Sequence, residues 1–303
     1  MSIDRRLCRS CPFPPVAFQD AQQLRTPSGS AQLTRVAALL NAQRATEALP
    51  PLAAAEVLSA IDRGGSEVTQ ERLWVLDPID GTRGFVAGRQ YAVALGLMHR
   101  GEVVLGVVGC PNLGTRGVGV CAPGEGVVFF AVRGYGSFQA PLRLFAGVDG
   151  ESAASAVTRA FASPEVHRLA IDAARPLAAL RYVESAPDSV CAAHGDTARL
   201  AAALGLLNAP ERLDSCAKYG VLARGEAELY LRFPPVGYAE KIWDHAAGGI
   251  LVEEAGFIVS DCAGQPLDYS KGRTFTSMKG GIVAAPPAAH EALLAAVAQR
   301  VHR

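Results

Sequence analysis

The sequence carries no net charge and no long hydrophobic run. Its 29 Lys and Arg residues equal its 29 Asp and Glu residues, whereas a protein that mainly coats nucleic acid or an anionic membrane needs a basic excess. The longest apolar runs, such as residues 91–98, are far shorter than the ~20 residues that cross a bilayer. Half of the residues are hydrophobic, which is enough for a large core. We therefore expect a soluble globular protein that binds neither nucleic acid nor membranes.

Cysteine is scarce and shows no disulfide pattern. The seven cysteines are odd in number and scattered, whereas a disulfide scaffold has a shorter chain and an even set. Cys8 and Cys11 have the spacing of zinc ligands, but no second Cys or His pair follows at a suitable interval. We expect a reducing, intracellular compartment. The N-terminus lacks the apolar segment of a secretory signal. Cytoplasm, plastid and mitochondrion stay open, and so does the oligomeric state.

The hydrophobic pattern divides the chain into two halves. Residues 1–145 combine helical stripes with apolar, β-branched runs, which predict an α+β region with an antiparallel sheet. Residues 146–303 alternate strands with helices and predict an α/β region. No internal repeat or low-complexity tract interrupts either half.

The segment Trp74–Thr82 concentrates the chemistry. Asp77 stands at the end of a short apolar strand, and Asp80 follows after a proline turn. Two carboxylates on one tight turn repel each other unless a cation lies between them, and hard oxygen ligands suit Mg²⁺. Gly81 lets the backbone pass close to a ligand, and the N–H groups of Gly81 and Thr82 would bind an anion if a helix begins there. The segment predicts adjacent metal and phosphate sites for phosphoryl transfer to water; an ordinary Asp-rich turn is the alternative.

A second segment, Lys241–Gly249, places Trp243 and Asp244 before a run of small residues. Asp244 is expected to begin a helix that ends at Gly256, so that its charge meets the positive end of the helix dipole. The alternative is an ordinary helix cap, because aspartate is common at that position. The bulky Trp243 would anchor the carboxylate.

Together the two segments resemble the lithium-sensitive, magnesium-dependent phosphatase superfamily that includes inositol monophosphatase, fructose-1,6-bisphosphatase and 3'(2'),5'-bisphosphate nucleotidase. The run Asp77–Thr82 matches the metal motif of that superfamily residue for residue, and Trp243 with Asp244 matches the second motif. The resemblance extends over nearly the whole chain from about Val16. Five longer segments resemble the bisphosphate nucleotidase branch: Gln90–Leu97, Cys110–Leu113, Asp214–Gly220, Tyr230–Pro234 and Gly237–Asp244.

The resemblance implies a fold and an activity. The fold would be a layered α-β-α-β-α sandwich of the inositol monophosphatase/fructose-1,6-bisphosphatase type, with the metal site where the two halves meet. The activity would be hydrolysis of a small-molecule nucleotide, 3'-phosphoadenosine 5'-phosphate, to AMP and phosphate by metal-activated water. The alternatives are a nucleotide-binding relative without turnover and an inositol monophosphatase-type activity.

The resemblance also implies roles for the residues around the metals. Asp77, Asp80 and Asp244 match the carboxylates that hold one Mg²⁺ beside the leaving oxygen. Asp77 and the carbonyl of Ile79 match ligands of the Mg²⁺ that activates water. The Thr82 hydroxyl matches a group that orients this water.

Five positions match substrate contacts: Gly81, Thr82, Ser215, Lys218 and Arg232. Lys218 and Arg232 have the charge to meet the phosphate that the product retains, and Ser215 has a hydroxyl for sugar or phosphate oxygens. An exposed ion pair is the alternative for the two cations. His194 is a further candidate, for the adenine pocket.

The sequence departs from the family pattern near its N-terminus. Phe18 and Gln19 align with a Glu-Glu pair that supplies a carboxylate to the water-activating metal. A glutamine amide offers only a neutral oxygen, which weakens Mg²⁺ binding and cannot act as a base. Asp20 and Glu47 stay open as substitutes. Asp4 does not have the helical context of the family aspartate that pairs with the motif threonine. A shortened chain, an impaired enzyme and a non-catalytic relative are the competing explanations.

Overall fold

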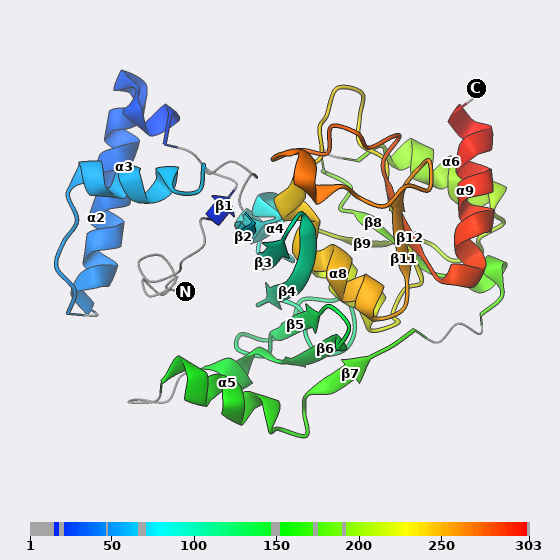
Figure 1. The fold of residues 1–303 in the computed structure, drawn as a ribbon, viewed down its shortest axis with the longest axis horizontal. Helices are drawn as coiled ribbons and strands as arrows, with labels where there is room; N and C mark the ends of the chain where they lie inside the picture. Colours follow the sequence, from blue (N-terminus) through cyan, green and yellow to red (C-terminus); the bar gives the residue numbers. More distant parts are fainter. Residues whose placement is uncertain are drawn as a thin grey trace.

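Two β-sheets with helices between and beside them make up the computed structural model (Figure 1). It describes residues 15–17, 21–46, 48–65, 71–146, 152–171, 175–189 and 192–301. Within these ranges no helix is long and apolar enough to cross a membrane.

The first sheet has seven strands, in the order in which they occur along the chain. They are β1 (Pro15–Ala17), β2 (Arg72–Asp80), β3 (Ala92–His99), β4 (Glu102–Cys110), β5 (Val127–Val132), β6 (Gly136–Pro141) and β7 (His167–Leu169). Strand β1 pairs parallel with β2, and every later neighbour pairs antiparallel. The expected antiparallel sheet is confirmed. Side chains along β3 alternate between buried and half-buried because successive residues of a strand point to opposite faces.

The second sheet has five strands in the order β11-β12-β10-β8-β9. They are β8 (Tyr182–Ser185), β9 (Glu211–Leu213), β10 (Leu229–Arg232), β11 (Ile258–Asp261) and β12 (Ile282–Ala285). Parallel pairs join β8 to β9 and β10, and antiparallel pairs join β12 to β10 and β11. Every residue of β8 and β10 is buried, as expected for strands that are covered on both faces.

Helices form further layers. The α-helices are α2 (Ser30–Thr46), α3 (Ala54–Asp62), α4 (Thr82–Val86), α5 (Ala153–Phe161), α6 (His194–Ala203), α7 (Ala217–Ala223), α8 (Ala246–Glu254) and α9 (Pro287–Val301). The 3₁₀-helices are η1 (Gln23–Arg25), η2 (Pro27–Gly29), η3 (Leu142–Phe145), η4 (Leu177–Ala179), η5 (Ile242–Asp244) and η6 (Tyr269–Lys271). Helices α7 and α8 contact both sheets, and α6 and α9 cover the outer side of the second sheet (Figure 1). This layered α/β arrangement confirms the predicted fold class.

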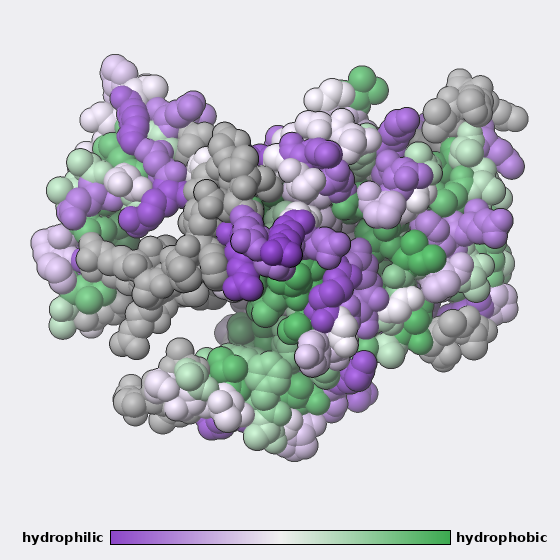
Figure 2. All heavy atoms as spheres, viewed as in Figure 1, coloured by the Kyte–Doolittle hydropathy of each residue, from purple (hydrophilic) through white to green (hydrophobic). Residues whose placement is uncertain are grey.

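The outer face of the first sheet carries apolar side chains. Phe130 on β5 points to this face, where it packs against Phe138 and against Phe161 of α5 at 4.8 Å between the Phe130 and Phe161 ring centroids. Figure 2 shows apolar atoms over the region of β4 to β6. Helices α2 and α3 pack on each other beyond the β1 edge of the sheet (Figure 1).

One buried cluster joins the inner faces of the two sheets. It contains apolar side chains from β2 to β5, from α7 and α8, and from β10 to β12. Strand β7 also adds residues from the second half of the chain to the first sheet. Both halves of the chain therefore contribute to one core. The division into residues 1–145 and 146–303 stays a prediction.

Glycines allow α8 to lie close to the first sheet and to α7. A Cβ atom at Gly106 on β4 would lie 2.5 Å from the Ala247 carbonyl oxygen and 2.5 Å from Ile250 Cγ2. A Cβ atom at Gly248 would lie 2.1 Å from Cδ2 of Tyr219. Real Cβ atoms do not make such contacts, so the position of α8 depends on these two glycines.

We expect Gly106→Ala to destabilise the protein by about 1–3 kcal/mol, because the added methyl group must displace α8. Gly109→Ala on the same strand is the matched control, since a Cβ atom there would have no neighbour within 4 Å. Urea unfolding of the two variants measures the difference. Equal stabilities would contradict the close approach of α8 to β4.

Candidate active site

The metal motif occupies the end of β2 and the turn into α4. Asp77 is 6% exposed, and its Oδ1 atom accepts the N–H of Ile79 at 3.0 Å. Gly81 has a φ angle of +77°, a left-handed conformation that favours glycine, and α4 begins at Thr82. The Thr82 hydroxyl donates to the Ile79 carbonyl at 3.1 Å. The local sequence therefore bends the backbone so that Asp77 and Asp80 project from one side of a turn.

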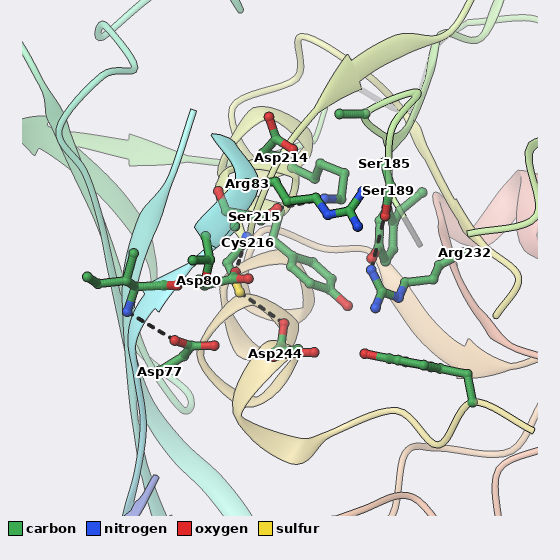
Figure 3. Close-up of a pocket in the computed structure, with 18 residues that line it drawn as sticks. Asp77, Asp80, Arg83, Ser185, Ser189, Asp214, Ser215, Cys216, Arg232 and Asp244 are labelled. Atoms are coloured by element: carbon green, nitrogen blue, oxygen red, sulfur yellow. Dashed lines mark hydrogen bonds between the residues drawn. The ribbon is translucent and has the colours of Figure 1, made fainter. Parts of the chain in front are cut away.

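A third carboxylate meets this turn from a distant segment. Oxygen atoms of Asp77, Asp80 and Asp244 all lie within 4.8 Å of one another. Asp244 is the last residue of η5, and α8 begins at Ala246. The prediction that Asp244 begins the long helix is therefore wrong by two residues, because a 3₁₀ turn precedes α8. Figure 3 shows the three side chains on one side of the cavity.

Ionisation is disfavoured at two of the three carboxylates. Burial, together with the nearby Asp80 charge, raises the pKa of Asp77 to about 7. Burial and the charge of Asp80 also raise the pKa of Asp244 well above its ordinary value. A bound cation would remove this repulsion, and an all-oxygen donor set suits a hard divalent metal. The residues therefore fit a metal ion by their spacing and by their chemistry.

Cys216 connects the carboxylates to the start of α7. Its backbone N–H donates to Asp80, and its thiol donates to the backbone carbonyl of Asp244 at 2.9 Å. Burial raises the pKa of the Cys216 thiol well above its ordinary value, so the group stays a proton donor. The preceding residue, Ser215, has a φ angle of +68°, a strained conformation for a residue with a side chain. In this conformation Ser215, just before α7, lies against Gly81. A Cβ atom added at Gly81 would lie 2.8 Å from Ser215 Cβ.

Two buried cations line the same cavity, and Figure 3 shows one of them, Arg232, across it from Asp77 and Asp80. Lys218 is 3% exposed and donates to the carbonyls of Leu213 at 3.1 Å and Ser215 at 2.8 Å. Arg232, at the end of β10, is 8% exposed and forms an ion pair with Glu240. Burial and the neighbouring Arg232 guanidinium lower the pKa of Lys218. The two cations are thus inside the protein, which excludes the alternative of an exposed ion pair.

The cavity between the carboxylates and the cations has a volume of about 360 Å³. It is lined by the β2–α4 turn, the start of α7, the end of β10 and Asp244 (Figure 3). Further residues of the wall are Arg83, Ser185, Ala186, Ser189, Asp214, Tyr219, Tyr230 and Tyr238. Sites for small ligands usually have this size and a mixed polar and aromatic lining.

Most of the predicted site residues line this one cavity: Asp77, Ile79, Asp80, Gly81, Thr82, Ser215, Lys218, Arg232 and Asp244. His194 is not among the described lining residues. It is the first residue of α6, where its Nε2 atom lies 3.1 Å from the carbonyl of Ala186, a wall residue. His194 therefore contacts a residue of the wall without being one of the described lining residues itself.

The residues with which the sequence departs from the family pattern near the N-terminus, and their possible substitutes, lie outside the described part of the chain. Phe18, Gln19, Asp20, Glu47 and Asp4 all belong to this group. Strand β1 ends at Ala17, which pairs with Leu76, the residue before Asp77.

Sequence reasoning missed two groups around the cavity. Arg89 forms ion pairs with Asp188 and Asp214, each at 2.9 Å, and so connects the segment after α4 with two loops of the second half. Glu240 and His245 are fully buried behind Arg232. Both flank the Trp243–Asp244 segment in sequence, but charged residues are common on surfaces, so their types do not signal burial.

Comparison with known proteins agrees with this geometry. The model of the inositol monophosphatase family matches residues 38–302. A 3'(2'),5'-bisphosphate nucleotidase of Oryza sativa is 39% identical over 296 residues, covering 95% of this chain and 77% of that protein. The enzyme with the same name from Emericella nidulans is 41% identical over 253 residues, covering 80% of this chain and 67% of that protein.

Solved structures agree at the level of the fold. CysQ from Bacteroides thetaiotaomicron, a bacterial member of the inositol monophosphatase family, superposes with a TM-score of 0.54 at 21% identity, covering 77% of this chain and 82% of that chain. An inositol monophosphatase of Thermotoga maritima gives 0.52 at 21% identity, covering 77% of this chain and 71% of that chain.

The layered fold and the convergent carboxylates define a phosphatase of the metal-dependent class. The chain belongs to the inositol monophosphatase family.

Asp77→Asn should change how the stability of the metal-free protein depends on pH. Because the pKa of Asp77 is raised, the folded protein keeps a proton that the unfolded chain releases between about pH 4 and about pH 7. Stability should therefore fall as the pH rises through this window, and the fall should be smaller in Asp77→Asn. Melting temperatures in buffers containing a chelator measure the effect.

The Asp77→Asn variant also tests whether the carboxylates hold a metal. Mg²⁺ at pH 7.5 should raise the melting temperature of the wild-type protein but not that of Asp77→Asn. Glu102→Gln is the control, since Glu102 is an exposed carboxylate at the start of β4. An equal response of all three proteins to Mg²⁺ would contradict the metal site.

Proposed function

We propose that the protein is a Mg²⁺-dependent phosphatase that hydrolyses 3'-phosphoadenosine 5'-phosphate to AMP and inorganic phosphate. The observation that carries the proposal is the charge of the cavity lining, in which three carboxylates converge and two buried cations stand apart from that cluster, with Arg232 across the cavity from Asp77 and Asp80 (Figure 3). A substrate with two phosphate groups fits both sides, since one phosphate would meet the metal and the other Lys218 and Arg232. Similarity of about 40% to proteins named bisphosphate nucleotidases supports the choice of a nucleotide.

The carboxylates and the turn would act on the phosphate that leaves. Asp77, Asp80 and Asp244, with the Ile79 carbonyl, would hold Mg²⁺, which supplies positive charge to the phosphoryl oxygens and acidifies water. Gly81 and Thr82 would contact the same phosphate, and the Thr82 hydroxyl is held in place by the Ile79 carbonyl.

The reaction is a direct displacement. The oxygen of a water molecule forms a bond to phosphorus, the bond between phosphorus and the 3'-oxygen breaks, and the 3'-oxygen takes up a proton. The products are AMP and phosphate, and no covalent bond to the protein forms. The cationic side would bind the 5'-phosphate unchanged, with Ser215 beside the sugar. We place His194 outside direct contact with the adenine, because it is not among the described lining residues and its Nε2 atom lies against the carbonyl of Ala186.

The assay compares two substrates with purified protein and Mg²⁺. Phosphate release from 3'-phosphoadenosine 5'-phosphate should exceed release from inositol 1-phosphate, because the inositol ester lacks a second phosphate for the cationic side. A chelator should stop the release. Equal or faster turnover of inositol 1-phosphate would contradict the proposed substrate. No turnover of either compound would contradict the proposed enzymatic activity.

A nucleotide-binding relative with impaired turnover is the second candidate. The observation that favours it is Gln19 at the position where the family has a glutamate. In that case the wild-type protein binds the nucleotide, and Gln19→Glu should raise the rate of phosphate release by about 10²-fold or more. Full activity of the wild-type protein, with no gain in Gln19→Glu, would exclude this candidate.

A further inference from the structure

Arg232 presents only one edge of its guanidinium to the cavity. Its Nε and Nη2 atoms donate to the two carboxylate oxygens of Glu240 at 2.6 and 2.7 Å. This bidentate pair occupies one edge completely. The remaining Nη1 atom lies 3.5 Å from Oγ of Ser185, another residue of the cavity wall (Figure 3). The contact with Glu240 therefore decides which donors of Arg232 can reach a ligand.

Glu240 is itself held in place. Its side chain is completely buried, and Oε2 also lies 3.0 Å from Nε2 of His245. Although burial opposes ionisation, the hydrogen bond to His245 and the charge of Arg232 lower the pKa of Glu240 to about 2. An ionised carboxylate only accepts hydrogen bonds, so Nε2 of His245 is the donor.

The support continues to Tyr219 on α7. Nδ1 of His245 lies 2.7 Å from the Tyr219 hydroxyl. Both ring nitrogens of His245 are therefore within hydrogen-bond distance of a buried partner, Glu240 on one side and Tyr219 on the other. The Tyr219 ring lies over Gly248 and against Tyr230, with 4.7 Å between the two tyrosine ring centroids. Four buried side chains thus form one chain of hydrogen bonds from α7 to the cavity.

Glu240, Asp244 and His245 also lie close enough together to suggest a second metal site. The observed partners argue against it. Both Glu240 oxygens already accept hydrogen bonds from Arg232, and both His245 nitrogens are engaged. Arg232 already compensates the negative charge of Glu240, so we assign no metal ion to this cluster.

We propose that Glu240 is a positioning residue that makes the cavity selective for substrates with a second phosphate, by holding the free edge of Arg232 toward that phosphate. This inference rests on the proposed function, since it needs a substrate with two phosphates. A flexible arginine loses side-chain entropy when it binds a ligand, whereas an arginine that is already fixed loses little. Glu240 also compensates the buried charge of Arg232, which would otherwise be unpaired between substrate molecules.

The test compares two nucleotides that differ in one phosphate. Kinetics and equilibrium binding are measured with 3'-phosphoadenosine 5'-phosphate and with adenosine 3'-monophosphate, which lacks the 5'-phosphate. In Glu240→Gln, KM and Kd for the bisphosphate should rise about tenfold or more, while kcat changes less than about threefold. Both parameters for the monophosphate should change less than about threefold, because that nucleotide does not use Arg232.

The matched control is Glu228→Gln. Glu228 is buried beside the other end of β10, where it pairs with Arg181 at 2.6 Å and lies outside the lining of the cavity. This variant loses a comparable ion pair, so it should show any general loss of stability but keep the wild-type preference for the bisphosphate. Melting temperatures of both variants establish that they are folded.

Two outcomes overturn the inference in distinguishable ways. If the wild-type protein neither binds nor hydrolyses the bisphosphate, the proposed function fails and the role of Glu240 fails with it. If the wild-type protein prefers the bisphosphate, but Glu240→Gln weakens the binding of both nucleotides equally or of neither, only the positioning role is wrong.

Discussion

Repulsion among three carboxylates is the constraint on which the rest of this structure depends. Asp77, Asp80 and Asp244 lie so close together that their negative charges raise the energy of the folded protein unless a cation or a proton intervenes. A fold that tolerates this arrangement must be stabilised elsewhere, and here a single core reaches across both sheets. The repulsion that destabilises the protein without a cation is therefore the same interaction that favours the binding of a cation.

The core positions the carboxylates because it fixes α8 between the sheets. Asp244 lies two residues before this helix, and the close approach of the helix to β4 requires the space that Gly106 leaves. The turn that carries Asp77 and Asp80 is part of the same sheet. Packing between α8 and β4 therefore sets how closely the three carboxylates meet, although neither element contributes a carboxylate to the cluster.

The cationic residues of the cavity are stabilised in a different way, because buried positive charge must be compensated. Lys218 and Arg232 are buried cations, and burial of a charge is costly unless it is paired and hydrogen-bonded. Backbone carbonyls receive the ammonium of Lys218, and Glu240 receives one edge of the Arg232 guanidinium. The zero net charge of the chain therefore conceals a local concentration of charge, because carboxylates and buried cations line the same cavity.

The sequence alone determined the features that arise from local geometry. The hairpin of β3 and β4 follows from two apolar, β-branched runs that a glycine-containing turn separates, and the Asp77–Thr82 turn follows from the order of its residues. Only the tertiary structure decided how closely Asp244 approaches this turn, that His194 is not among the described lining residues, and that Glu240 is buried. The physical reason is that local patterns report backbone conformation, whereas the burial and pairing of a charge depend on side chains from distant parts of the chain.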